Sequence, residues 1–328
     1  MKVLIIQTAF TGDVILATPM IEKIHLFYPN ACIDFLLKKG NEGLFENHPF
    51  INQILIFDKK QGKVKQLWSL MKQIRAKKYD YVINLHRFLS SGILVALSGA
   101  KHKIGFDKNP LSFTYTVKKT HLINQKGNFV HEIDRNLSLI QDFTDSKTTK
   151  PKLYPSDKDY NNVKINTEYI CIAPASVWFT KQFPLKKWIE LIDHLPSNIS
   201  VKLLGGPTDT DLCNNIKNGS KHQAVTVMAG QLNFLESAAL MQHARMNFVN
   251  DSAPLHMASA TNAPVAAIFC STIAAFGFTP VSDISFLIES NNHLPCRPCG
   301  LHGHKACPLG HFNCADLDVK AILKKVGF

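Results

Sequence analysis

An aspartate follows a glycine in the segment QTAFTGDVILATP, directly after the apolar run KVLII near the start of the chain. Because a buried strand gives way to a helix here, Asp13 stands where it can cap the helix and meet the positive end of its dipole. The same position suits a general base that takes a proton from a substrate hydroxyl. Gly12 allows a tight turn and the close approach of a ligand. A dinucleotide-binding G-x-G-x-x-G would need three glycines at this place, and only Gly12 is present, so the segment does not have this motif.

A second segment, NDSAPLHMASA, comes directly after a predicted strand and begins a predicted helix. Asp251 and Ser252 can cap that helix, and a helix start at the ligand edge of a sheet binds phosphate groups. His256 lies one turn into the helix, where it can reach the same anion. The alternative is a capped core helix whose histidine is bonded internally.

Two further segments have the pattern of strand, loop and helix. In APASVWFTKQFPLKKW, the hydroxyls of Ser176 and Thr180 precede the cation of Lys181, which suits a diphosphate, although surface lysines are usually only solvated. In LLGGPTDTD, Asp209 can accept hydrogen bonds from ribose hydroxyls, as acids do after the second strand of nucleotide-binding sheets. A metal-binding D-x-D and an ordinary helix start are the alternatives for this acid.

The tail CRPCGLHGHKACPLGHFNC has the cysteine spacing C-x2-C-x7-C-x6-C. Thiolates and imidazoles are ligands of structural zinc, so one interpretation is a zinc site at Cys296, Cys299, Cys307 and Cys314. The other is a cysteine-rich loop without a metal. No apolar run approaches the ~20 residues of a membrane span, and no signal peptide is recognised. We therefore expect a cytosolic protein whose eight cysteines are thiols.

Short apolar runs alternate with helical patterns along the chain, which predicts parallel strands joined by crossover helices. A length of 328 residues suits two domains, and the polar residues 144–162, with two prolines, are the predicted linker. We expect two doubly wound α/β domains that bind ligands at the carboxyl ends of their strands. The predicted strands are residues 3–6, 32–37, 53–57, 81–85, 169–173, 200–204, 224–227, 247–249 and 263–269, and the longest predicted helices are 14–27 and 129–143.

The positive charge is concentrated in the first half of the chain. Residues 1–165 hold 25 Lys and Arg against 14 Asp and Glu, whereas residues 166–328 hold 12 against 11. A basic half suggests an acidic partner, such as nucleic acid, anionic lipid headgroups or an anionic glycolipid. No nucleic-acid-binding motif is present, so the lipid and glycolipid partners remain, beside a merely soluble lysine-rich surface.

Taken together, these segments resemble glycosyltransferase family 9, the heptosyltransferases of lipopolysaccharide core assembly. The resemblance runs through GDVILATPMIEKIHLFYPNACIDFL, AKHKIGFDKNP, HEIDRNLSLI, TKQFP, GGPTDTD and DSAPLHMASA to the cysteine-rich tail. It implies the GT-B fold, in which two Rossmann-like doubly wound domains face a central cleft. Residues 1–155 would form the acceptor-binding domain, and residues 156–328 the nucleotide-sugar-binding domain with the Cys/His-rich tail and a final helix.

The resemblance also implies an inverting transfer of a heptose from ADP-heptose, without a metal or another cofactor. Asp13 would be the general base that deprotonates the acceptor hydroxyl. Lys181 and the helix start at Asp251 and Ser252 would bind the departing diphosphate. The other residues implied in the nucleotide pocket are Ser176, Leu232 and His256, with Asp209 on the ribose.

The implied acceptor is an acidic Kdo/heptose core of lipopolysaccharide, an anionic glycolipid that fits the basic first half. Its expected contacts are Gly12, His86, Arg87, Lys101 and Arg135. Family members work at the cytoplasmic face of the inner membrane, so we expect a cytoplasmic protein with peripheral contact there and no nucleic-acid partner. The alternatives are a transferase of the same fold that uses another nucleotide sugar for a different envelope or capsular polysaccharide, and a non-catalytic nucleotide-binding protein.

Overall fold

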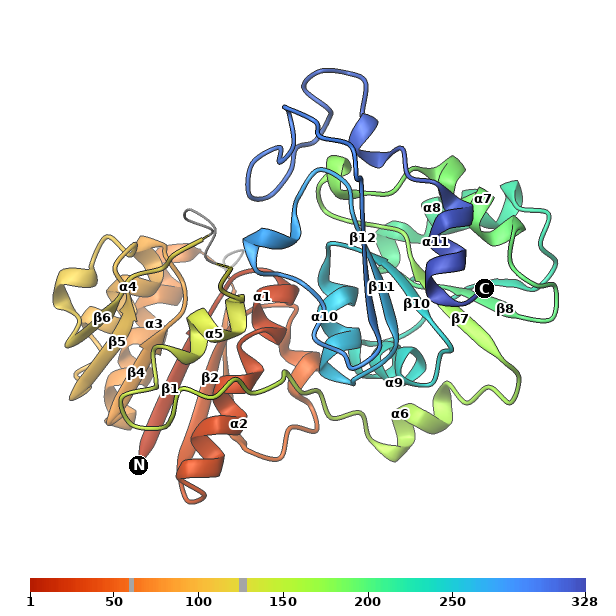
Figure 1. Ribbon diagram of the computed structural model, residues 1–328. Coiled ribbons are helices and arrows are strands. Elements are labelled where there is room, and N and C mark those ends of the chain that lie inside the picture. The colour runs from red at the N-terminus through yellow and green to blue at the C-terminus, as the bar shows by residue number, and fades with distance from the viewer. Residues whose placement is uncertain (59–61, 124–128) are drawn as a thin grey trace. The chain divides into compact units, whose positions relative to one another are not determined.

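Two parallel six-stranded sheets form the framework of the protein. The computed structural model describes residues 1–58, 62–123 and 129–328. The chain divides into two compact units, Met1–Tyr154 and Pro155–Phe328, each built around one of the sheets (Figure 1). The predicted α/β class with two doubly wound parallel sheets is confirmed.

Unit 1, Met1–Tyr154, has the strand order β3-β2-β1-β4-β5-β6, which is the order of a Rossmann sheet. The order reverses between β1 and β4, and ligands of such sheets bind outside the carboxyl ends of the strands at that switch point. The strands are β1 (Lys2–Gln7), β2 (Cys32–Lys38), β3 (Ile51–Phe57), β4 (Tyr81–Asn84), β5 (His102–Phe106) and β6 (Val117–Lys119). The helices are α1 (Thr11–Ile15), α2 (Thr18–Phe27), α3 (Lys63–Lys77), α4 (Leu89–Ala96) and α5 (Glu132–Leu137), with 3-10 turns η1 (Glu42–Phe45) and η3 (Ser112–Thr114).

Two helices predicted in unit 1 differ from the structure. The predicted helix 14–27 is two helices, α1 and α2, because Pro19 lies in the first turn of α2 and has no backbone N–H for a continuous helix. The predicted helix 129–143 is regular only in α5. The hydroxyl of Ser138 donates to the carbonyl oxygen of Arg135 at 2.6 Å, a local bond of the kind that competes with helix formation.

The predicted linker, residues 144–162, is fixed to unit 1 over its first part. The Lys23 ammonium on α2 is buried and lies 2.5 Å from the Asp145 carboxylate. The Tyr154 hydroxyl donates to the Glu22 carboxylate at 2.8 Å. Residues 144–154 therefore pack along α2, and the second part of the segment contributes α6 (Asp157–Asn162) to unit 2.

Unit 2, Pro155–Phe328, has the strand order β12-β11-β10-β7-β8-β9. Read from β9, this repeats the order of unit 1, with the switch point between β7 and β10. The strands are β7 (Tyr169–Ala173), β8 (Ser200–Leu203), β9 (Val225–Val227), β10 (Asn247–Asn250), β11 (Val265–Phe269) and β12 (Ser285–Glu289). The further helices are α7 (Leu185–Asp193), α8 (Thr210–Gly219), α9 (Phe234–Gln242), α10 (Ala253–Ala260) and α11 (Val319–Val326), with 3-10 turns η4 (Phe179–Lys181), η5 (Pro207–Asp209), η6 (Ala274–Phe276) and η7 (Asn313–Ala315).

The core of unit 2 lies between the sheet and its helices, and Trp188 on α7 is fully buried in it against Phe183. A long loop leaves β12, contains three of the tail cysteines, and returns through η7 to α11 (Figure 1). Among the described residues, no helix combines the length and apolar character needed to span a membrane.

Candidate functional site

An ion pair crosses the switch point of unit 2. Lys181 follows β7 and Asp251 follows β10, and these two strands are neighbours in the sheet. The Lys181 ammonium lies 2.7 Å from Oδ2 of Asp251, with side-chain exposures of 15% and 8%. The Thr272 hydroxyl, which follows β11, donates to the same carboxylate oxygen at 2.6 Å. The negative charge of Asp251 is therefore compensated, and a cation is held at the ligand edge of the sheet.

Asn250 holds the two sides of this switch point together. Its side-chain amide donates to the carbonyl oxygen of Pro174 at 2.7 Å, and its side-chain oxygen accepts the backbone N–H of Phe183 at 2.9 Å. The side chain is fully buried. Sequence reasoning did not assign this residue, although an asparagine at the end of an apolar strand was a visible signal. It fixes the loop that carries Lys181 to the end of β10.

Helix α10 begins beside this ion pair. Ser252 is its N-cap residue, and within the described residues its side chain makes no capping bond; its hydroxyl donates to the carbonyl oxygen of Asn250 at 3.3 Å. A helix start carries partial positive charge and attracts phosphate. In α10, Pro254 has no N–H, and the N–H of Leu255 donates to the carbonyl oxygen of Ser252 at 3.1 Å. His256 is buried on the same helix, and its ring lies 6.4 Å from that of Phe278.

The remaining predicted donor residues lie at the same edge of the sheet. The Asp209 carboxylate accepts the backbone N–H of Gly206 at 2.8 Å, so it also closes the turn after β8. Ser176 is half-buried, and its carbonyl oxygen accepts the Gln182 side-chain amide at 2.7 Å. The structure thus brings all seven to the carboxyl edge: Ser176 and Lys181 after β7, Asp209 after β8, Leu232 after β9, and Asp251, Ser252 and His256 after β10.

The corresponding edge of unit 1 carries Asp13. It occupies the third position of α1, is half-buried, and accepts the backbone N–H of Phe10 at 3.2 Å. This bond stabilises the start of the helix and orients the carboxylate at the end of β1. Asp13 thus makes the hydrogen bond expected of a residue that caps the start of a helix. It is compatible with a role as base, because the carboxylate remains at the ligand edge of the sheet.

Two side-chain pairs position the elements around Asp13. Oγ1 of Thr8 lies 3.0 Å from Nδ1 of His86, which joins the ends of β1 and β4 across the switch point. The Thr11 hydroxyl donates to the side-chain oxygen of Asn41 at 2.9 Å, which joins α1 to the end of β2. Sequence reasoning found His86 but not Thr8 or Asn41, whose signal was a polar residue within about four positions of the end of a predicted strand.

Only some of the other predicted acceptor residues lie at the carboxyl edge of the sheet. Gly12 adjoins Asp13 on α1, and the exposed Arg87 adjoins His86, so both lie at the carboxyl edge. Lys101 does not: it precedes β5, at the amino edge of the parallel sheet, where its ammonium lies 3.9 Å from the Asp80 carboxylate.

Arg135 is also in a different setting from the one expected. Its side chain is buried on α5, where it donates to the Glu132 carboxylate at 2.6 Å and to the carbonyl oxygen of Val130 at 2.6 Å. Burial raises the pKa of Glu132, but a hydrogen bond from His121 and the charge of Arg135 together hold it below its usual value. These bonds engage Arg135 within unit 1, whereas Lys101 lies at the edge of the sheet opposite Asp13.

The four tail cysteines have different surroundings. Cys314 is buried in the core of unit 2, and burial raises its pKa to about 11. Cys307 is half-buried, and backbone N–H groups, first that of Phe312, lower the pKa of its thiol. Sγ of Cys296 lies 3.9 Å from Nε2 of His311. Throughout the described part of the chain, no group of three or more His, Cys, Asp or Glu side chains is arranged to hold a metal ion.

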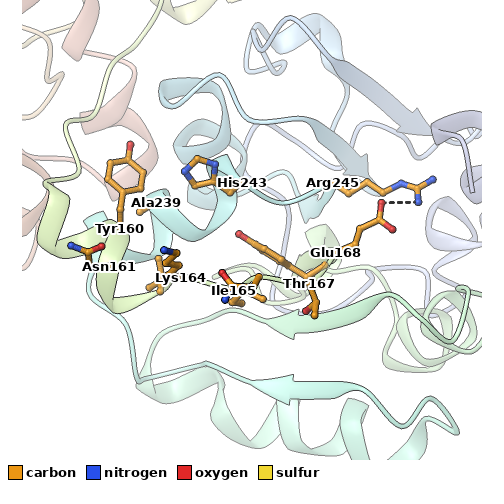
Figure 2. A pocket seen from close by; sticks show the side chains of 12 residues that line it. Tyr160, Asn161, Lys164, Ile165, Thr167, Glu168, Ala239, His243 and Arg245 are labelled. Atoms are coloured by element: carbon orange, nitrogen blue, oxygen red, sulfur yellow. Dashed lines mark hydrogen bonds and ion pairs between the residues drawn. The ribbon is translucent and has the colours of Figure 1, made fainter.

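A pocket in unit 2 lies at the opposite edge of its sheet from Lys181 and Asp251. It is lined by residues 160, 161 and 163–169 with Ala239, His243 and Arg245, at the start of β7 and before β10, which is the amino edge of the sheet (Figure 2). Figure 2 shows the Arg245 guanidinium directed at the Glu168 carboxylate, 3.1 Å away. Arg245 also donates to the carbonyl oxygen of Gly327. The pocket therefore shares no residue with the ligand edge.

Comparisons with known proteins show the family to which the chain belongs. The sequence profile of glycosyltransferase family 9 (heptosyltransferase) matches residues 67–307. The lipopolysaccharide heptosyltransferase 3 of Escherichia coli is 32% identical over 306 residues, covering 88% of this chain and 89% of the relative. Two solved structures, the E. coli ADP-heptose lps heptosyltransferase II and the E. coli heptosyltransferase WaaC with ADP, have TM-scores of 0.76 and 0.77 at 18% identity, each with 99% of both chains covered.

The likeness to those structures extends over both units, and it confirms the predicted GT-B class. The profile match covers most of the chain and includes Lys181, Asp209 and the helix start at Asp251. The chain therefore belongs to glycosyltransferase family 9, the heptosyltransferases, and is a glycosyltransferase.

Proposed function

We propose that the protein transfers a heptose from ADP-heptose to an acidic core acceptor in lipopolysaccharide biosynthesis, with inversion at the anomeric carbon and with Asp13 as the general base. The proposal is supported by the relative named lipopolysaccharide heptosyltransferase 3. It is also supported by solved structures of WaaC, one with ADP and one with ADP-2-deoxy-2-fluoro heptose. Unit 1 is proposed to bind the acceptor and unit 2 the donor.

The observation that carries the donor assignment is the cation beside a helix start at the switch point of unit 2. Lys181 stands 2.7 Å from Asp251, directly at the start of α10. An ammonium and the positive end of a helix dipole together suit a diphosphate, whose charge grows as it leaves the sugar. Asp209, on the neighbouring strand end, is proposed to accept hydrogen bonds from the ribose hydroxyls.

In the proposed reaction, a carboxylate oxygen of Asp13 takes the proton of the acceptor hydroxyl. The acceptor oxygen then forms a bond to the anomeric carbon, and the bond between that carbon and the diphosphate oxygen breaks. The electron pair leaves with ADP, where Lys181 and the start of α10 stabilise the developing charge. Attack on the face opposite the leaving group inverts the anomeric configuration.

A panel of nucleotide sugars tests the donor assignment. Thermal unfolding of the protein is measured with ADP-heptose, ADP-glucose, UDP-glucose and GDP-mannose, because a ligand that binds the folded state raises Tm according to its concentration relative to Kd. ADP release is then measured with a heptose-containing core acceptor. We expect stabilisation and turnover with ADP-heptose. Stabilisation by a uridine or guanosine sugar alone would overturn the donor assignment, and binding without turnover on the core acceptor would overturn the acceptor assignment.

A peripheral contact with the inner membrane is the second part of the proposal, and α3 supports it. This helix contains no acidic residue and presents two apolar side chains to solvent, Val64 (71% exposed) and Trp68 (58% exposed). Lys65 and Lys72 are exposed on the same helix. Tryptophan beside lysine is typical of helices that lie in the headgroup region of anionic membranes.

Vesicle binding tests this contact. Co-sedimentation is measured with phosphatidylcholine vesicles, with and without phosphatidylglycerol, at low and high salt. Charge reversal at Lys65 and Lys72 should weaken binding to the anionic vesicles by at least about fivefold per residue, since the loss of one basic residue near such a surface alone costs about 1 kcal/mol. Charge reversal at Lys158 and Lys164 in unit 2 is the matched control. Equal binding to both vesicle types would exclude an electrostatic membrane contact.

A further inference from the structure

Thr180 lies where three segments of unit 2 meet. It directly precedes Lys181 in η4, and its side chain is 1% exposed. Its hydroxyl oxygen accepts the backbone N–H of His304 at 2.8 Å and the hydroxyl of Ser271 at 3.0 Å. Its backbone N–H donates to the carbonyl oxygen of His304 at 3.1 Å. The loop after β7 is thereby bonded both to the cysteine-rich segment, residues 296–307, and to the end of β11.

Gly303 shows how closely the cysteine-rich segment approaches the lysine. Its φ is +74°, in the region that favours glycine. A Cβ at this position would lie 2.8 Å from Oγ1 of Thr180 and 3.1 Å from Cγ of Lys181. The backbone of the cysteine-rich segment thus packs against the stem of the lysine side chain, and any side chain at position 303 would displace that stem.

Arg297 anchors the other end of the segment. Its guanidinium donates to the carbonyl oxygens of Cys270 and Thr272 at 2.7 and 2.8 Å, and to the Glu289 carboxylate at 2.7 Å. Thr272 in turn donates its hydroxyl to Asp251, the partner of Lys181. The backbone next to Lys181 and its ion-pair partner Asp251 are therefore both connected to the cysteine-rich segment.

We propose that Thr180 is a positioning residue for Lys181, and that through it the cysteine-rich segment forms part of the donor diphosphate site. The inference rests on the proposed function. A lysine side chain has a flexible four-carbon stem, and holding it costs conformational entropy on binding. Fixing its backbone at Thr180 and its stem at Gly303 reduces that cost before the diphosphate arrives. The cysteine-rich segment thus helps to hold Lys181, although it lies far from this lysine in the sequence.

The test compares two ligands on Thr180→Val, which removes the hydroxyl and keeps the branched shape. Calorimetry gives Kd for ADP, which carries the diphosphate, and for adenosine, which does not. We expect Kd for ADP to rise roughly tenfold, the size of one lost hydrogen bond, because the loop that carries Lys181 loses its bond to the N–H of His304. Kd for adenosine should stay within about twofold of the wild-type value. Thr180→Ser keeps the hydroxyl and should restore the affinity for ADP.

Thr261→Val is the matched control, because Thr261 is also buried but donates within its own helix, to the carbonyl oxygen of Met257. If Thr180→Val does not fold, Gly303→Ala perturbs the same contact from the other segment and should also weaken only ADP. Unchanged ADP binding in Thr180→Val, or equal loss for ADP and adenosine, would overturn the inference and leave the proposed function standing. A wild-type protein that does not bind ADP would instead refute the proposed function, and this inference with it.

Discussion

Asp13→Asn separates the two roles that the structure permits for this residue. The carboxylate accepts the backbone N–H of Phe10 at 3.2 Å, so it contributes to the stability of α1. As a base it would also accept the proton of the acceptor hydroxyl. Asparagine keeps an oxygen of the same reach for the N–H of Phe10, but it cannot take up a proton at neutral pH. The substitution therefore keeps an acceptor for the N–H of Phe10 and removes the base together with its negative charge.

The two effects differ in magnitude. Losing the charge at a helix start costs about 0.3–1 kcal/mol, whereas losing a capping bond as well, as in Asp13→Ala, costs about 1 kcal/mol or more. For a unit of 154 residues, 1 kcal/mol corresponds to a Tm shift of about 2–4 °C. General base catalysis contributes about 10²–10⁴ in rate, so its loss raises the barrier by at least about 2.7 kcal/mol.

The assay follows ADP release from ADP-heptose with a core acceptor, together with Tm and with Kd for ADP. Asp13→Asn should lower kcat at least a hundredfold, keep Kd for ADP within about twofold, and change Tm by no more than a few degrees. Asp13→Ala should lose the same activity and have a lower Tm than Asp13→Asn. Substantial turnover by Asp13→Asn would refute the assignment of the base and leave only the capping role.

Three further results are expected. Lys181→Met should lower the rate of ADP release by about 10²–10³, as the removal of one donor from a developing negative charge does, and an unchanged rate would remove the lysine from the leaving-group site. The pKa of Glu132 is depressed in the folded state, so the stability that it contributes is complete above its unfolded value of about 4.3 and is lost as pH falls through the folded value. Urea unfolding of wild type should therefore weaken more steeply than that of Glu132→Gln below about pH 4.5, and parallel profiles would contradict this. Iodoacetamide at neutral pH should alkylate Cys307 before Cys171, because backbone N–H groups lower the pKa of the first thiol and burial raises that of the second; the opposite order would contradict the assigned surroundings.

The central strands of both sheets were predictable because their residues are buried on both faces. The residues of β1, β7 and β11 form continuous apolar runs, which is the pattern of parallel strands covered by helices. The strands β5, β6 and β12 were not predicted. Residues of β6 and β12 are partly exposed at sheet edges, and a short half-polar sequence such as VKK has no distinctive periodicity. Pairing with a neighbouring strand defines them.

The resemblance to the family implied the donor residues as a group. The expectation that ligands bind at the carboxyl ends of parallel strands supports that grouping, because these ends meet at one edge of the sheet. That expectation does not apply to Lys101 and Arg135, which were chosen for charge alone. Charge does not say at which end of a strand a lysine lies, or whether an arginine is buried in its own ion pair.

The sequence by itself determined the strand–helix alternation, the polar residues at strand ends and the excess of positive charge in the first half, because each depends on residues near one another in the chain. Only the tertiary structure decided that Thr180 is bonded to His304, that Asn250 joins two strand ends, and that Arg135 is paired with Glu132 inside unit 1. The first two of these contacts join residues 76 or more positions apart. The third depends on burial, which is set by the packing of the whole unit and not by local sequence.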